Sequence, residues 1–404
     1  MSCFAANAED GQPVPGRGNY LYGYGFDELI QSLPSMEGKT IAVTGCTSGT
    51  GYVLAREAAQ KGARVLMLNR PSPRAEASVT RLTPTPKSAP PGGVFADPVS
   101  SPKASAASKN LAEETGGSVE HVDCDLTSFA SCAKAAESVL KRVGDNGLDV
   151  LCCNAAVMYI KDVVTEDGFD MQMQTNHLGH HVLVAKLMPA LAAAGAKRGE
   201  ARVVMHSSEA KHIDGMNGSI MHPPSWGARL QPEYFEKHAN GELGGEGWPV
   251  PGKIMILHGP KHTRYFQSKL ANYVYTYALK DKLDAAGSKI KAVVAHPGTC
   301  KSRLIENGFE GSDYDLLNPK WFESVMFEPV MMSVDDGAQG IIRSCLEEDI
   351  QSGDFLGPAR PAYPCRFWGP AEKLPMEDFL LEPEQKELVV AKSEEATGVK
   401  LEVQ

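Results

Sequence analysis

A tyrosine and a lysine, Tyr265 and Lys269, stand four residues apart in the stretch YFQSKLANYVYTYALKDKL. On a helix this spacing brings both side chains to one side, a single turn apart. A phenol has an ordinary pKa of about 10, and a nearby ammonium lowers that pKa toward the range in which the phenol exchanges protons at neutral pH. Of the 12 tyrosines, Tyr265 alone has a lysine four residues on. The pair predicts acid–base chemistry; the plainer alternative is a buried tyrosine beside a lysine that reaches solvent.

A glycine-rich segment, TGCTSGTG at residues 44–51, follows a predicted strand, KTIAVTG, and opens a predicted helix, YVLAREAAQKGA, after which comes the strand ARVLMLNR. Its glycines, Gly45, Gly49 and Gly51, let the backbone turn sharply and approach a pyrophosphate, whose charge a helix N-terminus favours. A glycine pattern alone is weak, but the strand, loop, helix and strand around it are typical of dinucleotide-binding folds. We therefore predict a dinucleotide site at this loop.

The second strand ends at Asn69 and Arg70. An acidic residue at this strand end would hold the adenosine ribose hydroxyls, whereas a basic residue suits a 2′-phosphate. Because the acid is missing and Arg70 is present, the sequence favours NADP(H) over NAD(H). The alternative is an arginine that only solvates the surface.

The rest of the chain continues the alternation of strands and helices. The predicted strands are SVEHVDCDL, LDVLCCNAAV, ARVVMHSSEA, KIKAVVAHPGT and GDFLGPA. A helix at 127–143 has Thr127 as its expected cap, a helix at 168–195 carries Asn176 amid apolar residues, and a capping box at 333–336 starts a helix that ends at Leu346. This order predicts an α/β fold: a single Rossmann-like doubly wound parallel sheet of about seven strands, with helices on both faces and loop insertions.

Within the chain we expect one large domain at 38–358. An N-terminal arm at 1–37 precedes it, with a short helix around 26–33, and a C-terminal extension at 359–404 follows, with a final helix near 383–396. Residues 71–108 interrupt the pattern, and 82–108 are rich in Pro, Ser and Ala, which predicts a mobile surface insertion. A long insertion at 209–262 precedes the Tyr265 helix. It and a later loop carry aromatic residues: Trp226, Tyr234, Phe235, Trp248, Trp321, Phe322 and Phe327.

Composition and charge argue against several kinds of partner and site. The 404 residues carry 40 Lys+Arg against 50 Asp+Glu, a net charge of -10, without a basic run, which argues against nucleic acid as a partner. Neither a secretory signal nor a stretch of eighteen apolar residues is evident, so we expect no transmembrane segment and a cytoplasmic or organelle-matrix location. The nine cysteines are scattered and the eleven histidines lack metal-binding spacing, so we expect reduced thiols and no metal site.

Taken together, these motifs resemble the short-chain dehydrogenase/reductase superfamily over roughly 38–358. The resemblance rests on TGCTSGTG, Asp125-Leu126, the strand end CNAAV, Asn176 in TNHLG, Ser208 after VVMHS, Tyr265 with Lys269, and HPGT at 296–299. DGFDMQMQTNHLGHH and YFQSKLAN look most like the branch of retinol dehydrogenases, WW-domain oxidoreductases and light-dependent protochlorophyllide reductases. Two features depart from the family: Ala156 replaces a usual glycine, and the spacing from Ser208 to Tyr265 is much longer than usual.

The resemblance implies a role for each site residue. Tyr265 would be the acid or base, Lys269 would lower its pKa and hold the nicotinamide ribose, Ser208 would donate to the substrate oxygen, and Asn176 would order a helix kink and a proton-relaying water. The residues implied to bind the cofactor are Gly45, Thr47, Ser48, Gly49, Thr50, Gly51, Arg70, Asp125, Leu126, Asn154, Ala155, Tyr265, Lys269, Pro297, Gly298 and Thr299.

The first functional hypothesis is an NADP(H)-dependent oxidoreductase that acts on a carbonyl or alcohol of a bulky, largely apolar small molecule, because aromatic residues occur in both long loops. These aromatics could equally hold the loops to the fold. A second hypothesis is a non-catalytic nucleotide-binding scaffold subunit, and a third is a pigment reductase of the protochlorophyllide type, which typically has a cysteine where Leu270 and Ala271 stand. A homo-oligomer is implied by resemblance alone, through the helices that carry Asn176 and Tyr265.

Overall fold

The computed structural model describes residues 23–82, 117–212, 228–244, 260–302, 304, 331–360 and 366–403. Several predictions fall outside these residues: most of the N-terminal arm, nearly all of the 82–108 insertion, parts of the 209–262 insertion, and five of the aromatic residues, namely Trp226, Trp248, Trp321, Phe322 and Phe327.

Eight strands form one sheet in the described part of the chain, in the spatial order β3-β2-β1-β4-β5-β6-β7-β8. Their bounds are β1 Thr40–Thr44, β2 Arg64–Asn69, β3 Ser118–Asp123, β4 Val150–Cys153, β5 Ala201–His206, β6 Ile290–Ala295, β7 Phe355–Arg360 and β8 Trp368–Leu374. Strands β1 to β7 pair in parallel, so that Ile41 lies opposite Val65 on one side and Val150 on the other. The predicted doubly wound parallel sheet is confirmed.

The strand count is the one correction to the predicted sheet. The eighth strand, β8, belongs to the C-terminal extension and pairs antiparallel with β7. Its sequence, WGPAEKL, gave no strand signal because it contains glycine, proline and charged residues. Such residues are tolerated at the edge of a sheet, where one side of the strand needs no partner.

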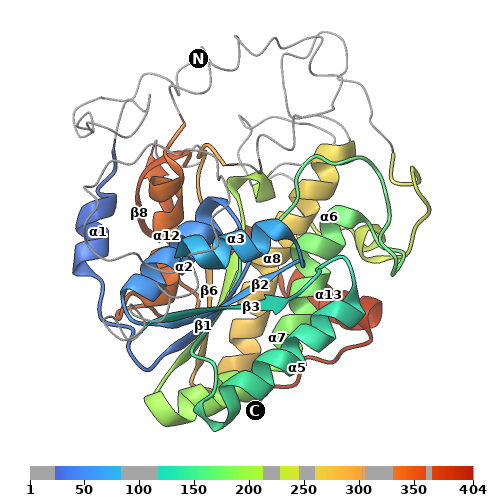
Figure 1. The fold of residues 1–404 in the computed structure, drawn as a ribbon. Coiled ribbons are helices and arrows are strands. Elements are labelled where there is room, and N and C mark those ends of the chain that lie inside the picture. Colours follow the sequence, from blue (N-terminus) through green and yellow to red (C-terminus); the bar gives the residue numbers. More distant parts are fainter. Residues whose placement is uncertain are drawn as a thin grey trace.

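The helices follow the strands in the order that the sequence predicts. They are α1 Phe26–Ser32, α2 Gly49–Gln60, α3 Pro73–Leu82, α5 Phe129–Val143, α6 Met171–Met173, α7 Gly179–Arg198, α8 Pro260–Ala285, α12 Val334–Leu346 and α13 Pro383–Thr397. Between them lie a π-helix, η4 Gln174–Leu178, and the short turns η3 Gly144–Asn146, η5 Glu209–His212, η7 Pro232–Phe235 and η9 Asp378–Leu380. Figure 1 shows α1, α2 and α12 on one face of the sheet and α5, α7, α8 and α13 on the other.

Two apolar clusters hold these layers together, one on each face. Alternate residues of β1 supply them: Ile41 and Val43 point into the cluster beneath α2 and α12, and Ala42 points into the cluster beneath α5, α7 and α8. Every residue of β1, β4 and β5 is buried, which is the pattern of parallel strands covered on both faces. All seven cysteines in the described residues are buried, unpaired thiols.

Two expected caps have different outcomes. Ser333 begins α12 as expected, since its hydroxyl accepts from the N–H of Asp336 at 3.0 Å. Helix α5 begins one residue later than expected: Ser128 is the cap, and Thr127 instead donates its hydroxyl to Asp125 at 2.7 Å. Both residue types can cap a helix, but Thr127 is hydrogen-bonded to Asp125 in a turn that precedes the helix.

The predicted interruption at 71–108 starts later than expected, because residues 73–82 form helix α3.

The helical region Met171–Arg198 is long and apolar enough, by length and composition, to cross a membrane, with a mean hydropathy of 1.2. Within the fold, 78% of its most apolar window is buried. It packs against α5 and the sheet, which is the environment of a core helix.

Candidate active site

Many of the predicted cofactor residues follow the carboxyl ends of the parallel strands. The chain leaves β1 toward β2 on one side and later returns to place β4 on the other side. The crevice at such a reversal is where open α/β sheets bind ligands. The glycine loop follows β1 and Asn154 follows β4, so both lie at this position.

The glycine loop needs its glycines for two reasons. Gly45 and Gly49 have φ angles of 73° and 66°, a region that side chains disfavour. A Cβ atom on Gly45 would lie 2.8 Å from the Cα of Ala155, and one on Gly51 would lie 2.3 Å from Nδ2 of Asn154. The loop and the end of β4 are therefore packed backbone to backbone, as the predicted pyrophosphate site requires.

Ser48 precedes helix α2, and its side chain makes no hydrogen bond to the first turn of the helix. By contrast, α5 and α12 are each capped by a serine hydroxyl. The first N–H groups of a helix have no partner within the helix and carry its positive dipole end. An uncapped start behind a glycine loop fits the phosphates of a dinucleotide, so the residues present suit such a cofactor.

Asn69, at the end of β2, holds the glycine loop in place. Its side-chain oxygen accepts from the N–H of Cys46 at 2.8 Å, and its buried Nδ2 has no hydrogen-bond partner in the described residues. Arg70 follows immediately and is exposed. Asn69 stands where an acid would occur in an NAD(H) site; its amide oxygen holds the loop, and the next residue is exposed.

Other predicted cofactor residues have structural partners of their own. The Asn154 side chain donates to the backbone oxygen of Thr44 at 3.0 Å and accepts from Thr50 at 2.9 Å, which ties β1 and α2 to β4. Asp125 accepts from Thr127, and Leu126 packs against Gly179, where a Cβ would lie 2.8 Å from the Leu126 oxygen. These side chains shape the crevice, and they remain predictions as direct cofactor contacts.

The structure brings Tyr265, Ser208 and Lys269 together. Tyr265 and Lys269 lie one turn apart on α8, and the Lys269 ammonium is 5.7 Å from the centre of the Tyr265 ring. The Ser208 hydroxyl, which follows β5, is near enough to the Tyr265 phenol to lower its pKa. Lys269 also donates to the backbone oxygen of His206 at 3.1 Å. Ser207 is bonded to the backbone of Lys269 at 2.7 Å, so β5 and α8 are fixed to each other at this point.

Burial dominates the protonation of this pair. It raises the pKa of the Tyr265 phenol above its ordinary value of 10, and the interaction with the Ser208 hydroxyl opposes this rise only in part. Burial also lowers the pKa of the Lys269 ammonium from 10.5 to about 7. The expected lowering of the phenol pKa by Lys269 is therefore not produced by the chain's own groups, because the ammonium is itself desolvated and lies over the ring.

Asn176 sits in the π-helix η4, so the predicted single helix at 168–195 is interrupted there. The Asn176 side chain accepts from the N–H of Val157 at 2.8 Å and donates to the Ser268 hydroxyl at 2.9 Å. Its backbone oxygen accepts from Asn272 at 3.0 Å. The π-helix lies where the kink is expected, and Asn176 joins the segment after β4 to α8 next to Tyr265. The proton-relaying water remains a prediction.

The loop after β6 lies on the opposite side of the crevice. Gly298 has a φ of 62°, and a Cβ there would lie 2.4 Å from the backbone oxygen of Phe367. The N–H of Thr299 donates to that same oxygen at 2.7 Å. Pro297, Gly298 and Thr299 are therefore held by the segment just before β8, as a loop that would border the nicotinamide.

Two residues near Tyr265 gave no signal in the sequence. Tyr159 has a φ of 55°, a strained value for a tyrosine, and its ring centre lies 5.3 Å from that of Tyr265 and 4.3 Å from that of His262. Arg264 is fully buried, with its Nε 3.0 Å from Asp170. Neither a left-handed tyrosine nor a buried arginine has a local sequence pattern that could have identified it.

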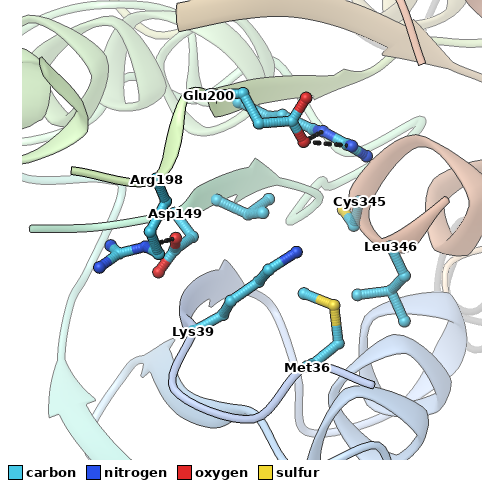
Figure 2. Close-up of a pocket in the computed structure, with 9 residues that line it drawn as sticks. Met36, Lys39, Asp149, Arg198, Glu200, Cys345 and Leu346 are labelled. Atoms are coloured by element: carbon cyan, nitrogen blue, oxygen red, sulfur yellow. Dashed lines mark hydrogen bonds and ion pairs between the residues drawn. The ribbon is translucent and has the colours of Figure 1, made fainter. Parts of the chain in front are cut away.

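A small cavity of about 40 Å³ lies far from these residues. It is at the amino-terminal ends of β1, β4 and β5, and Figure 2 shows Lys39 reaching across it and the Arg198–Asp149 ion pair at its edge. Arg202, which also lines the cavity, is paired with Glu200. Because parallel sheets bind ligands at the carboxyl ends of their strands, we do not assign it to the cofactor or substrate.

The fold and the glycine loop are those typical of dinucleotide-binding α/β proteins. The profile of the family described as short chain dehydrogenase matches residues 94–220. The chain is 28% identical over 284 residues to the short chain dehydrogenase/reductase dpchH of Colletotrichum higginsianum, a match that covers 70% of this chain and 59% of that protein. It is 27% identical to retinol dehydrogenase 12 of Bos taurus over 81% of this chain and 79% of the relative.

Among solved structures, an uncharacterized protein from Mycobacterium paratuberculosis superposes with a TM-score of 0.58 at 25% identity, covering 93% of this chain and 98% of the other. The sequence is similar to short-chain dehydrogenases/reductases, and among them to retinol dehydrogenases.

Proposed function

We propose that this protein is an NADP(H)-dependent oxidoreductase that interconverts a carbonyl and an alcohol on a bulky, largely apolar small molecule. The observation that carries the proposal is the convergence of three groups: the Tyr265 phenol, the Ser208 hydroxyl beside it, and the buried Lys269 ammonium one turn away. A hydroxyl pair of this kind can share the oxygen of a carbonyl, with one group donating a proton while the other stabilises developing charge.

Each residue then has a defined task in the direction of reduction. The bound cofactor supplies a hydride to the carbonyl carbon. Tyr265 gives its proton to the oxygen as charge builds there, and Ser208 donates a second hydrogen bond to that oxygen. Lys269, whose pKa is about 7, can then return a proton to the phenolate. In the oxidative direction the same protons move back.

Preference for the 2′-phosphate rests on charge at the end of β2. Asn69 places an uncharged amide where an acid would repel a phosphate, and its oxygen is already engaged by the loop. The guanidinium of the exposed Arg70, the next residue, can make a bidentate pair of hydrogen bonds to a phosphate.

The apolar wall beside Tyr265 supports the substrate class. Met158 and Phe266 pack against Tyr265 in a cluster of buried residues, and the partly buried Tyr159 and Leu304 lie against it. An apolar surface next to the proton donor suits a hydrophobic carbonyl or alcohol. The similarity to a protein named as a retinol dehydrogenase points the same way. The scaffold and pigment-reductase alternatives are not favoured by these relatives.

The test is consumption of NADPH by the purified protein with a panel of retinoids, steroids, quinones and aliphatic aldehydes. Tyr265→Phe should abolish turnover, by about a thousandfold or more, and leave NADPH binding nearly intact. Tyr277→Phe is the matched control, because it removes another buried hydroxyl of α8, one bonded to Gly353 at 3.1 Å. Retained turnover in the Tyr265 variant would show that the acid is misassigned.

Homo-oligomer formation and a cytoplasmic or organelle-matrix location remain proposals. The surface expected for pairing is, however, covered within the chain: α13 packs along α8, and Ser393 is bonded to His177 of the π-helix at 2.8 Å. We therefore expect any oligomer to use another surface.

A further inference from the structure

A cluster of buried charges lies directly beneath the candidate serine. The Lys211 ammonium is 3.1 Å from a carboxylate oxygen of Glu209 and 3.1 Å from one of Glu377. The Glu377 carboxylate also accepts from His212 at 2.8 Å and lies 3.1 Å from a guanidinium nitrogen of Arg366. The Lys211 side chain is completely buried. We call this set the Glu377 cluster.

The cluster is fixed to the fold from the Glu377 side. The backbone N–H of Glu377 donates to the Tyr273 hydroxyl at 2.9 Å, and Tyr273 lies on α8, two turns beyond Tyr265. The faces of Tyr273 and Phe355 also enclose the Lys211 ammonium, at 5.0 and 4.7 Å from their ring centres. Glu377 is therefore held by α8 through a hydrogen bond that does not involve the turn it contacts.

That turn carries Ser208. It is the 3-10 turn η5, Glu209–His212, and it starts one residue after the serine. The N–H of Lys211 donates to the backbone oxygen of Ser208 at 3.1 Å, and the N–H of Ala210 donates to the Ser208 hydroxyl at 3.2 Å. Whatever holds Lys211 and His212 thus also sets the direction of the Ser208 hydroxyl.

The cluster reaches the nicotinamide side of the crevice as well. His296 accepts from the N–H of Gly298 at its Nδ1, 3.2 Å away, so its proton is on Nε2. This Nε2 lies 3.5 Å from Glu209. Burial lowers the pKa of His296 to about 4, which keeps the ring neutral and suited to this orientation. The loop at 297–299 and the Ser208 turn therefore meet at one carboxylate.

Both carboxylates remain charged although they are buried. Burial raises the pKa of Glu377, but Lys211 and His212 outweigh burial and hold it at about 2. For Glu209, Lys211 and His296 likewise outweigh burial, so that its pKa is lowered. Removal of the lysine or of one carboxylate would leave its partner's charge unneutralised inside the protein.

Glu209, His212 and Glu377 also have the spacing of a metal site, with ligand atoms within 4.8 Å of one another. The Lys211 ammonium, however, already contacts both carboxylates. A divalent cation would have to displace a buried lysine from two carboxylates and two aromatic faces. The position of the cation is therefore taken by lysine.

We propose that Glu377, in the C-terminal extension, is a positioning residue of the active site: through Lys211 and His212 it fixes the turn that aims the Ser208 hydroxyl at the substrate oxygen. The proposal rests on the proposed function only for the role of Ser208. Its structural content, that residues 207–212 are held from the C-terminal extension, stands independently.

The first variant is Glu377→Gln, compared with Lys386→Met as a matched control. Lys386→Met breaks an exposed ion pair between the same extension and Asp281 of α8. With NADPH and 9,10-phenanthrenequinone as probe, kcat of Glu377→Gln should fall by about tenfold to a hundredfold while the Kd for NADPH stays within about twofold. Hydrogen–deuterium exchange should rise in peptides that cover 205–212. The control variant should leave both kcat and the exchange at 205–212 unchanged.

The double variant Lys211→Met/Glu377→Gln separates positioning from stability. It removes one positive and one negative charge together, so the melting temperature should return toward that of the wild type, whereas kcat should stay low because the turn is still unanchored. Recovery of kcat along with stability would mean that the cluster only supports the fold, and would overturn the proposal.

Two further outcomes are decisive. If the wild type consumes no NADPH with any compound of the panel, the proposed function fails, and the exchange data alone decide the positioning claim: unchanged exchange at 205–212 in Glu377→Gln refutes it. If elemental analysis finds stoichiometric metal in the purified protein, and EDTA lowers its melting temperature, the cluster is a metal site and the proposal is wrong.

Discussion

Two fully buried lysines, Lys269 and Lys211, should differ in how their replacement by methionine changes the free energy of unfolding: the first replacement should raise it and the second should lower it. Lys269 has a backbone oxygen as its hydrogen-bond acceptor, whereas Lys211 contacts two carboxylates. Burial lowers the pKa of Lys269 from 10.5 to about 7, and the gap between these values corresponds to about 5 kcal/mol. Lys269→Met removes this cost and keeps the length of the side chain. The acceptor, His206 O, retains the Asn272 amide at 3.2 Å, so no buried oxygen is left unpaired.

The pH dependence follows from the sign of the shift. Between pH 7 and 10.5 the unfolded chain keeps the Lys269 proton and the folded chain releases it, so the wild-type free energy of unfolding rises with pH in this window. The cost of burying the ammonium is therefore about 4 kcal/mol at pH 7 and about 2 kcal/mol at pH 9. We expect Lys269→Met to be more stable than wild type by up to these amounts, and to lose turnover.

Lys211→Met is the matched control for this experiment. It leaves Glu209 and Glu377 short of one positive charge, and removal of one partner from a buried ion pair typically destabilises a protein by about 3–5 kcal/mol. The measurement is urea unfolding of wild type and both variants at pH 7, 8 and 9, followed by tryptophan fluorescence. A Lys269→Met variant that is less stable at every pH, or whose advantage does not shrink between pH 7 and 9, would refute the reasoning.

The remaining predictions concern the cofactor and the C-terminal helix. Arg70→Ala should weaken NADPH binding by about tenfold or more and leave NADH binding nearly unchanged in a fluorescence titration; equal loss for both would rule out a 2′-phosphate contact. Val389→Asp places a charge at a fully buried position of α13 and should undock that helix from α8. The variant should melt at lower temperature and self-associate in size-exclusion chromatography with light scattering, and an unchanged elution and melting temperature would show that α13 does not cover an adhesive surface.

The sequence predicted the helices, strands and loops that form the site better than the protonation of its side chains. Periodicity and glycine spacing locate β1, the glycine loop and α2, because these depend on local backbone requirements such as the positive φ of Gly45 and Gly49. The spacing of Tyr265 and Lys269 correctly placed them on one turn of α8. It could not give their pKa values, since these depend on burial by segments far away in the chain.

Other features were out of reach for the same reason. The π-helix at Asn176 exists because its side chain joins Val157 and Ser268, residues on separate elements. The choice of Ser128 over Thr127 as a cap depends on Asp125, and the left-handed conformation of Tyr159 on its contacts with His262 and Tyr265. Each of these is a tertiary preference that overrides a local one.

The C-terminal extension, expected as an appendage at 359–404, contacts both sides of the candidate site. Before β8, Phe367 holds the loop at Thr299; after it, Glu377 holds the turn that carries Ser208. Further on, the Ser393 hydroxyl of α13 is hydrogen-bonded to His177, in the π-helix next to Asn176. The loop at 297–299, the turn that carries Ser208 and the π-helix are therefore all in contact with the last part of the chain. It follows that catalytic competence should appear after, and not before, the docking of residues 366–403.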